Sequence, residues 1–196
     1  MLHTANYCYI LLHTDTYCFL YIHYIIYCYI LLHIVIHCYI LLHLATYWYI
    51  QLYSVVYCSI LLHIATCCYI LLYTNILCFI LLYTATYCYI KIHTATYCHI
   101  QLHTSIYCYI VLHTAIYCYI LLNIASYCFI QIYSPLYCFI LLYSALHWYI
   151  LLLTATDCYI IIYTVFYCSI LLHTSIYCYI LLHNDTFCFI HIYSAL

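Results

Sequence analysis

A ten-residue repeat runs through the chain and constrains its fold more than any other feature. The consensus is YCYILLHTAT, and residues 87–96 (YCYIKIHTAT) are a close copy. Every tenth residue from Cys8 to Cys188 is cysteine, apart from two tryptophans, and every tenth residue from Ile10 onward is isoleucine, apart from one leucine. Because the period holds throughout, we expect residues 1–196 to form a single array, without separate domains or capping repeats.

An even period suits strands better than helices. A helix turns by about 100° per residue, so equivalent residues of successive repeats would lie about 80° apart around it. Side chains of a strand alternate between two faces, and a period of ten keeps each column of equivalent residues on one face. Tyrosine, isoleucine and threonine also favour strands. The sequence therefore predicts an all-β fold: a β-solenoid-like stack of ten-residue repeats, with one or two repeats per coil. Hydrophobic helices are the alternative.

Two interleaved sets of columns differ in the residues that they accept. The columns of Cys8, Ile10 and Leu12 contain no polar substitution. The columns between them accept Gln51, Ser59, Asn123 and Asp157. This alternation is typical of a strand with one inward and one outward face. We therefore expect the Cys8, Ile10 and Leu12 columns to face the interior, and the T-A-T segment to form a corner.

Charged residues are almost absent, which limits the partners of the chain. Hydrophobic residues make up 73% of the sequence and charged residues 2%. The charged residues are Asp15, Lys91, Asp157 and Asp185. Without clustered lysine or arginine, we expect no nucleic-acid binding. So few surface charges are not enough to keep a folded chain soluble and monomeric. We therefore expect self-association and no specific partner. Membrane association is the one localisation that this composition favours, and no compartment follows from it.

The cysteines and histidines do not have the spacing of a metal site. They recur as C-x4-H-x4-C, as in Cys108, His113 and Cys118, whereas zinc ligands usually stand closer together. Residues five apart in a strand point to opposite faces. The chain also lacks glutamate and glycine, and nothing distinguishes a catalytic triad from the repeat background. The sequence therefore predicts no catalytic, cofactor-binding or metal-binding residue, no cofactor, and a protein that is not an enzyme.

The differences between repeats indicate an origin rather than an activity. Tyrosine columns change to histidine at His37 and to phenylalanine at Phe187, and the cysteine column changes to tryptophan alone, each by one nucleotide. We therefore infer no specific biochemical function and expect an open reading frame translated from tandem-repeat DNA. Two alternatives stay open: a structural or self-assembling β-solenoid repeat protein, and a membrane-embedded hydrophobic protein.

Overall fold

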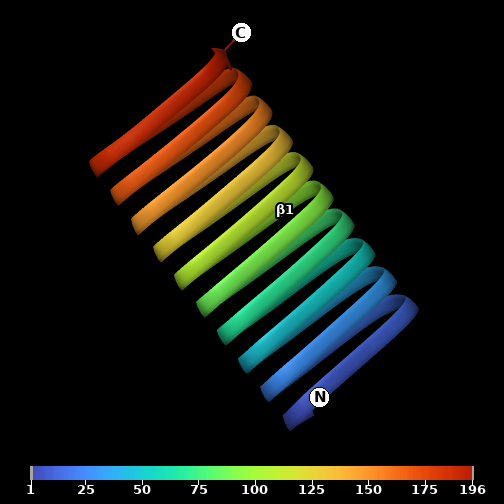
Figure 1. The fold of residues 1–196 in the computed structure, drawn as a ribbon. Coiled ribbons are helices and arrows are strands. Elements are labelled where there is room, and N and C mark those ends of the chain that lie inside the picture. Colours follow the sequence, from blue (N-terminus) through green and yellow to red (C-terminus); the bar gives the residue numbers. More distant parts are fainter. Residues whose placement is uncertain (1, 196) are drawn as a thin grey trace.

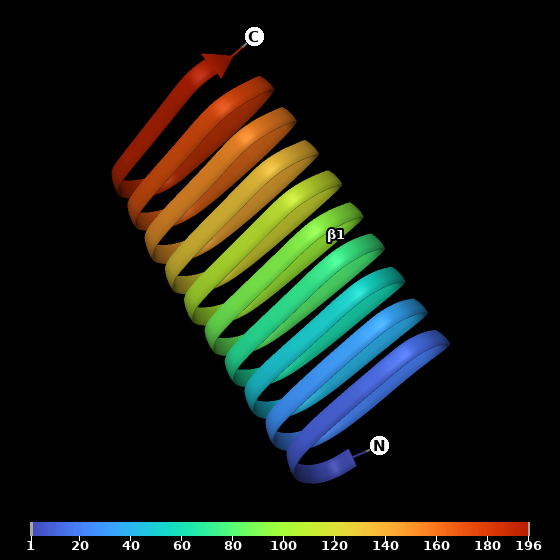
Figure 2. The same cartoon turned by 45° about the vertical axis from the view of Figure 1, so that its right-hand side comes forward.

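The chain forms one continuous strand that winds into a stack of turns. The computed structural model describes the backbone of residues 2–195, which is a single strand, β1 (Leu2–Ala195), and the side chains of residues 6–193. The ribbon is a flattened coil whose turns stack along one axis, with the two chain ends at opposite ends (Figures 1 and 2). The predicted all-β fold is confirmed. No helix occurs within residues 2–195, so the helical alternative does not hold there.

Each turn of the coil contains twenty residues, which is two sequence repeats. Side chains contact their equivalents twenty positions later: the rings of Tyr29 and Tyr49 are stacked with centroids 4.7 Å apart. His103 and Asn123 share a hydrogen bond of 2.7 Å at the same separation. These contacts decide between the two predicted coil lengths, in favour of two repeats per coil.

Two parallel sheets make up the long sides of the flattened coil. The first sheet contains residues 7–12 and every equivalent segment twenty residues further on, and the second sheet contains residues 17–22 and its equivalents. The chain runs through each sheet in the same direction at every turn (Figure 1). Identical columns therefore stack in register, at the strand spacing of about 4.8 Å.

The core lies between the two sheets and consists of the columns predicted to face inward. Central members of these columns are almost wholly buried, including Ile50, Leu52 and Cys58 at 0%, 0% and 4% exposure. Most of the neighbouring outward positions are partly or largely exposed, whereas Leu71 and Val111 are 8% and 5% exposed. Burial of an isoleucine or leucine side chain contributes about 1.5–3 kcal/mol, so the isoleucine and leucine columns dominate the stability of the stack.

The corners contain a fourth inward column, which the alternation of polar and apolar residues did not predict. Its members lie at the middle of T-A-T, and Ala65, Ala85 and Ala95 are 3%, 2% and 2% exposed. They stand three residues from the inward residues on either side, so the strand period of two is broken at the bend. Residues 2–195 contain no cis peptide bond and no positive φ, so the corner needs no glycine.

Candidate binding groove between two aromatic ladders

The outward face of the first sheet carries two ladders of aromatic rings. The Tyr7 wall contains every twentieth residue from Tyr7 to Phe187, and the Tyr9 wall contains every twentieth residue from Tyr9 to Phe189. In-register stacking places each ring against the ring of the next turn. Tyr69 and Tyr89, for example, have centroids 4.6 Å apart and ring planes 1° apart. This spacing is that of the strands, so the ladders follow directly from the repeat.

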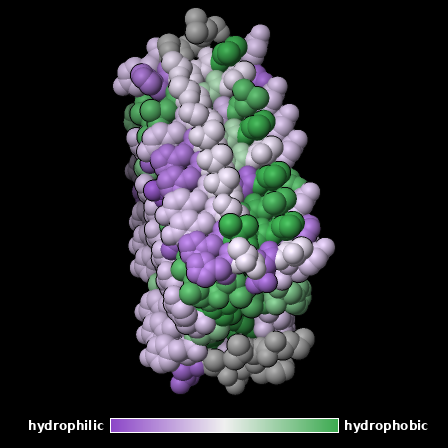
Figure 3. Space-filling view, turned by 90° about the vertical axis from the view of Figure 1, so that its right-hand side faces the viewer, coloured by the Kyte–Doolittle hydropathy of each residue, from purple (hydrophilic) through white to green (hydrophobic). Residues whose placement is uncertain are grey.

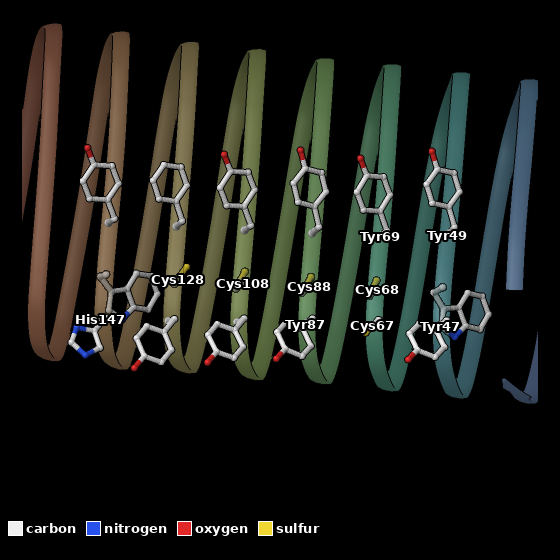
Figure 4. Close-up of a pocket in the computed structure, with 18 of the residues that line it drawn as sticks. Tyr47, Tyr49, Cys67, Cys68, Tyr69, Tyr87, Cys88, Cys108, Cys128 and His147 are labelled. Carbon is white, nitrogen blue, oxygen red and sulfur yellow. The ribbon is translucent and has the colours of Figure 1, made fainter. Parts of the chain in front are cut away.

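A groove lies between these two walls, and we call it the aromatic groove. The walls stand two residues apart along each strand, about 6.6 Å, and the cysteine between them points into the core. No side chain therefore rises between the walls. Figure 4 shows Tyr49 and Tyr69 in one row, Tyr47 and Tyr87 in the other, and core cysteines such as Cys88 between the rows. The groove has a volume of about 1420 Å³.

The Tyr9 wall is the more regular of the two. Consecutive rings stack without a break from Tyr9 to Tyr149, and the wall loses its ring at Ser169. Seven strand spacings give this stretch a length of roughly 34 Å. The Tyr7 wall is interrupted by Cys67, which lies in the row of Tyr47 and Tyr87 (Figure 4).

The aromatic groove has no charged lining. Its walls contain no Asp, Lys or Arg. Burial and the neighbouring tyrosines raise the pKa of Tyr49 and of Tyr89, so both phenols stay protonated at neutral pH. The groove therefore offers an apolar, aromatic surface with phenolic hydroxyls as its main polar groups.

The equivalent groove of the second sheet is smaller and its walls are less regular. Its volume is about 750 Å³. Ser59, Leu77 and Asp157 take the places of rings in its walls. Since the two sheets have the same backbone arrangement, these substitutions account for the difference between the two grooves.

Beneath the outward faces, the cysteines form one column in each sheet. The column of the second sheet runs from Cys18 to Cys178 without interruption, whereas Trp48 and Trp148 interrupt that of the first sheet. The cysteines within the described residues are free thiols. Burial and the adjacent thiol raise the pKa of Cys28 and of Cys168 above the ordinary value, so these thiols are poor nucleophiles.

The predicted separation of cysteine and histidine is present in the structure. Cys108 is buried in the core, whereas His113 stands on the outward side and stacks on His93 and Tyr133. Within the described residues, no three His, Cys, Asp or Glu side chains are grouped so that they hold a metal ion.

The aromatic groove does not follow from the alternation of inward and outward residues in the sequence. The signal for it is the Tyr-Cys-Tyr triplet, which places two aromatic side chains on one face around an inward cysteine. The triplet predicts a groove only when the coil length is known. A twenty-residue turn assigns alternate repeats to different sheets, so the more regular aromatic columns lie on the first sheet and the less regular ones on the second.

The comparisons with known proteins give no relative. Among residues 2–195, no helix has the length and hydrophobicity needed to cross a membrane. No specific biochemical function follows from the fold of this repeat chain. No protein-family model, curated protein or solved structure matches it.

Proposed function

We propose that the chain acts as a structural, self-assembling β-solenoid that adds copies of itself at the ends of the stack. The observation that carries this proposal is the exposure of core columns in the outermost turns. Ile190 and Ile192 are 43% and 45% exposed, whereas Ile170 and Leu172 in the preceding turn are 0% and 1% exposed. A further turn stacked on this end would bury them.

The backbone of the outermost turns favours the same partner. A terminal strand pairs on one side, so its other side presents free N–H and C=O groups that are a template for another strand. A second copy of this chain supplies strands with the same repeat and the same ring spacing. Few charges oppose the addition, since the charged residues of the outermost turns are Asp15 and Asp185.

Assembly as a filament needs neither catalysis nor a nucleic-acid partner, and we propose neither. The chain has one basic side chain, Lys91, outside the histidines, and no carboxylate pair suited to acid–base chemistry.

The test is growth from denatured chain after dilution, followed by sedimentation and electron microscopy. We expect sedimenting filaments that seed further growth and contain strand by circular dichroism. The double variant Ile190→Lys, Ile192→Lys should slow growth at least tenfold, because it places charges on the exposed core columns. The single variant Ile124→Lys is the control, since Ile124 is 57% exposed in a central turn. A wild-type chain that stays a soluble monomer at micromolar concentration would contradict the proposal.

Adsorption to membrane surfaces is a second candidate. Large apolar side chains such as Ile34, Ile64 and Ile124 are 56%, 50% and 57% exposed at the corners of the coil, and many tyrosines are exposed on the sheets. Figure 3 shows groups of hydrophobic side chains, in green, along one side of the stack. Such surfaces are typical of interaction with lipid or protein. Flotation with neutral phosphatidylcholine vesicles tests it: chain that stays at the bottom of the gradient argues against adsorption.

We also propose that the array originated as translated tandem-repeat DNA. The core contains side chains that a selected core would exclude. The indole N–H groups of Trp48 and Trp148 and the amide of Asn75 are buried without a hydrogen-bond partner. A comparison of silent and amino-acid-changing differences among the repeat copies tests this origin. Equal rates at inward and outward codons support it, and an excess of silent changes at inward codons argues for selection of the core.

A further inference from the structure

We propose that the aromatic groove of the first sheet is a binding site for elongated, planar aromatic molecules, which lie along the axis of the stack. This proposal goes beyond assembly and does not depend on it, because a single chain contains the groove. Its starting point is the Tyr9 wall, whose stacked rings extend unbroken from Tyr9 to Tyr149.

The chemistry of the lining selects the class of ligand. Aromatic rings interact favourably with other rings at centroid distances of about 4.5–7 Å, and rings make up both walls of the aromatic groove except at Cys67 and Ser169. The periodic spacing of the rings repeats the same contact at every turn. A long planar molecule therefore gains contacts in proportion to its length, whereas a compact one contacts two or three turns.

Other ligand classes lack partners in this groove. A nucleic acid needs basic side chains, and the lining contains no Lys or Arg. A bound peptide needs backbone partners, and the backbone of the central turns is already paired with the turns above and below. A sugar needs several polar groups at fixed positions, and the groove provides mainly the phenolic hydroxyls of its walls.

Cys67 makes the occupancy of the groove measurable. It is the one cysteine in an outward column, it replaces a ring of the Tyr7 wall, and it is partly exposed. Its neighbour in sequence, Cys68, is 3% exposed and belongs to the core. A ligand in the groove covers Cys67, whereas a ligand bound elsewhere leaves the thiol accessible.

The experiment titrates the full chain with thioflavin T, an elongated planar dye, and measures both dye fluorescence and the rate at which iodoacetamide alkylates Cys67. We expect saturable binding and an at least fivefold slower alkylation of Cys67 at saturation. The double variant Tyr69→Ser, Tyr89→Ser removes two adjacent rings from the Tyr9 wall and should weaken binding at least tenfold. The matched control is Tyr119→Ser, a ring of the second sheet, which should change the affinity less than twofold.

Three results would overturn the proposal: dye binding that leaves the alkylation rate of Cys67 unchanged, binding that survives the double variant, and an equal loss in the control. Circular dichroism of each variant shows whether the strand content is retained. If the double variant does not fold, the alkylation of Cys67 in the unaltered chain still decides the question. Filament growth without protection of Cys67 would refute the binding site in the groove and leave the proposed assembly intact. Protection of Cys67 without filament growth would support the binding site and refute the proposed assembly.

Discussion

Asn75 shows what a single residue does in the core of this stack. It occupies the corner column, where alanine is common, and is 3% exposed. Neither atom of its side-chain amide has a hydrogen-bond partner. A buried polar group without a partner costs about 1–3 kcal/mol. We therefore expect Asn75→Ala to raise the free energy of unfolding by about 1–3 kcal/mol, measured as a shift of the denaturant midpoint.

Asn123 provides the matched control for this substitution. It lies in the histidine column on the outward side, and its amide is hydrogen-bonded to the ring of His103 at 2.7 Å. Asn123→Ala removes a satisfied group and should lower the stability slightly. Equal shifts for the two variants would mean that the amide of Asn75 finds a partner in solution.

At the scale of the structural element, the corner of β1 at Ala95 is filled by a small inward residue, whereas other corners of the same column hold larger ones, such as Val55 and Ile25. Ala95 is 2% exposed between the inward columns of two adjacent sides of the coil. Additional methylene groups in a packed core cost about 1–3 kcal/mol. We expect Ala95→Leu to lower the free energy of unfolding by that amount. Thr94→Ile is the control, because position 94 is exposed and isoleucine stands at the equivalent Ile34, three turns earlier. A stability of the leucine variant equal to that of the control would show that the corner has spare volume.

His93 and His113, in the histidine column that follows the first sheet, are expected to make stability depend on pH. Burial, with the charge of Lys91 as a second cause, lowers the pKa of His93 and of His113 below the ordinary value of 6.5. The unfolded chain therefore binds more protons than the folded chain once the pH falls below about 6.5, and stability decreases in that range. The denaturant midpoint should fall between pH 7 and pH 5. The double variant His93→Tyr, His113→Tyr keeps the stacked rings and should reduce this dependence, and the part that remains is expected from His99, whose pKa is also lowered by burial. A wild-type midpoint that does not change with pH would refute the explanation.

The sheets were predictable from the sequence, whereas the corners and the groove were not. The Cys8, Ile10 and Leu12 columns reveal their inward direction because burial excludes polar residues from them. The column of Ala95 does not, because a corner turn accepts Asn75 and Ser105 as well as alanine. The walls of the groove depend on which rings lie one turn apart. The sequence alone does not distinguish a turn of ten residues from one of twenty, so it does not show which rings stack on each other.

At the scale of the whole molecule, both even coil lengths satisfy the ten-residue period, so packing decides between them. A coil of one repeat has too short a circumference to enclose the Cys8, Ile10 and Leu12 columns from two opposing sides. Twenty residues allow two sheets to face each other, with isoleucine and leucine of one sheet packed on those of the other. The same arrangement exposes residues of the core columns, such as Ile190 and Ile192, in the outermost turns, and in the proposed assembly the residues of those turns would control growth.

In the proposed assembly, Asp15 and Asp185 would oppose growth. Both belong to the corner column, and both are exposed because they lie in the outermost turns. Another turn stacked over either end would bury the carboxylate, which is unfavourable for an unpaired charge. We expect the double variant Asp15→Ala, Asp185→Ala to shorten the lag before filament growth at least tenfold at pH 7. Asp157→Ala removes the same charge from an outward position of an inner turn. An equal effect of Asp157→Ala would mean that net charge controls the assembly, rather than the two ends of the stack.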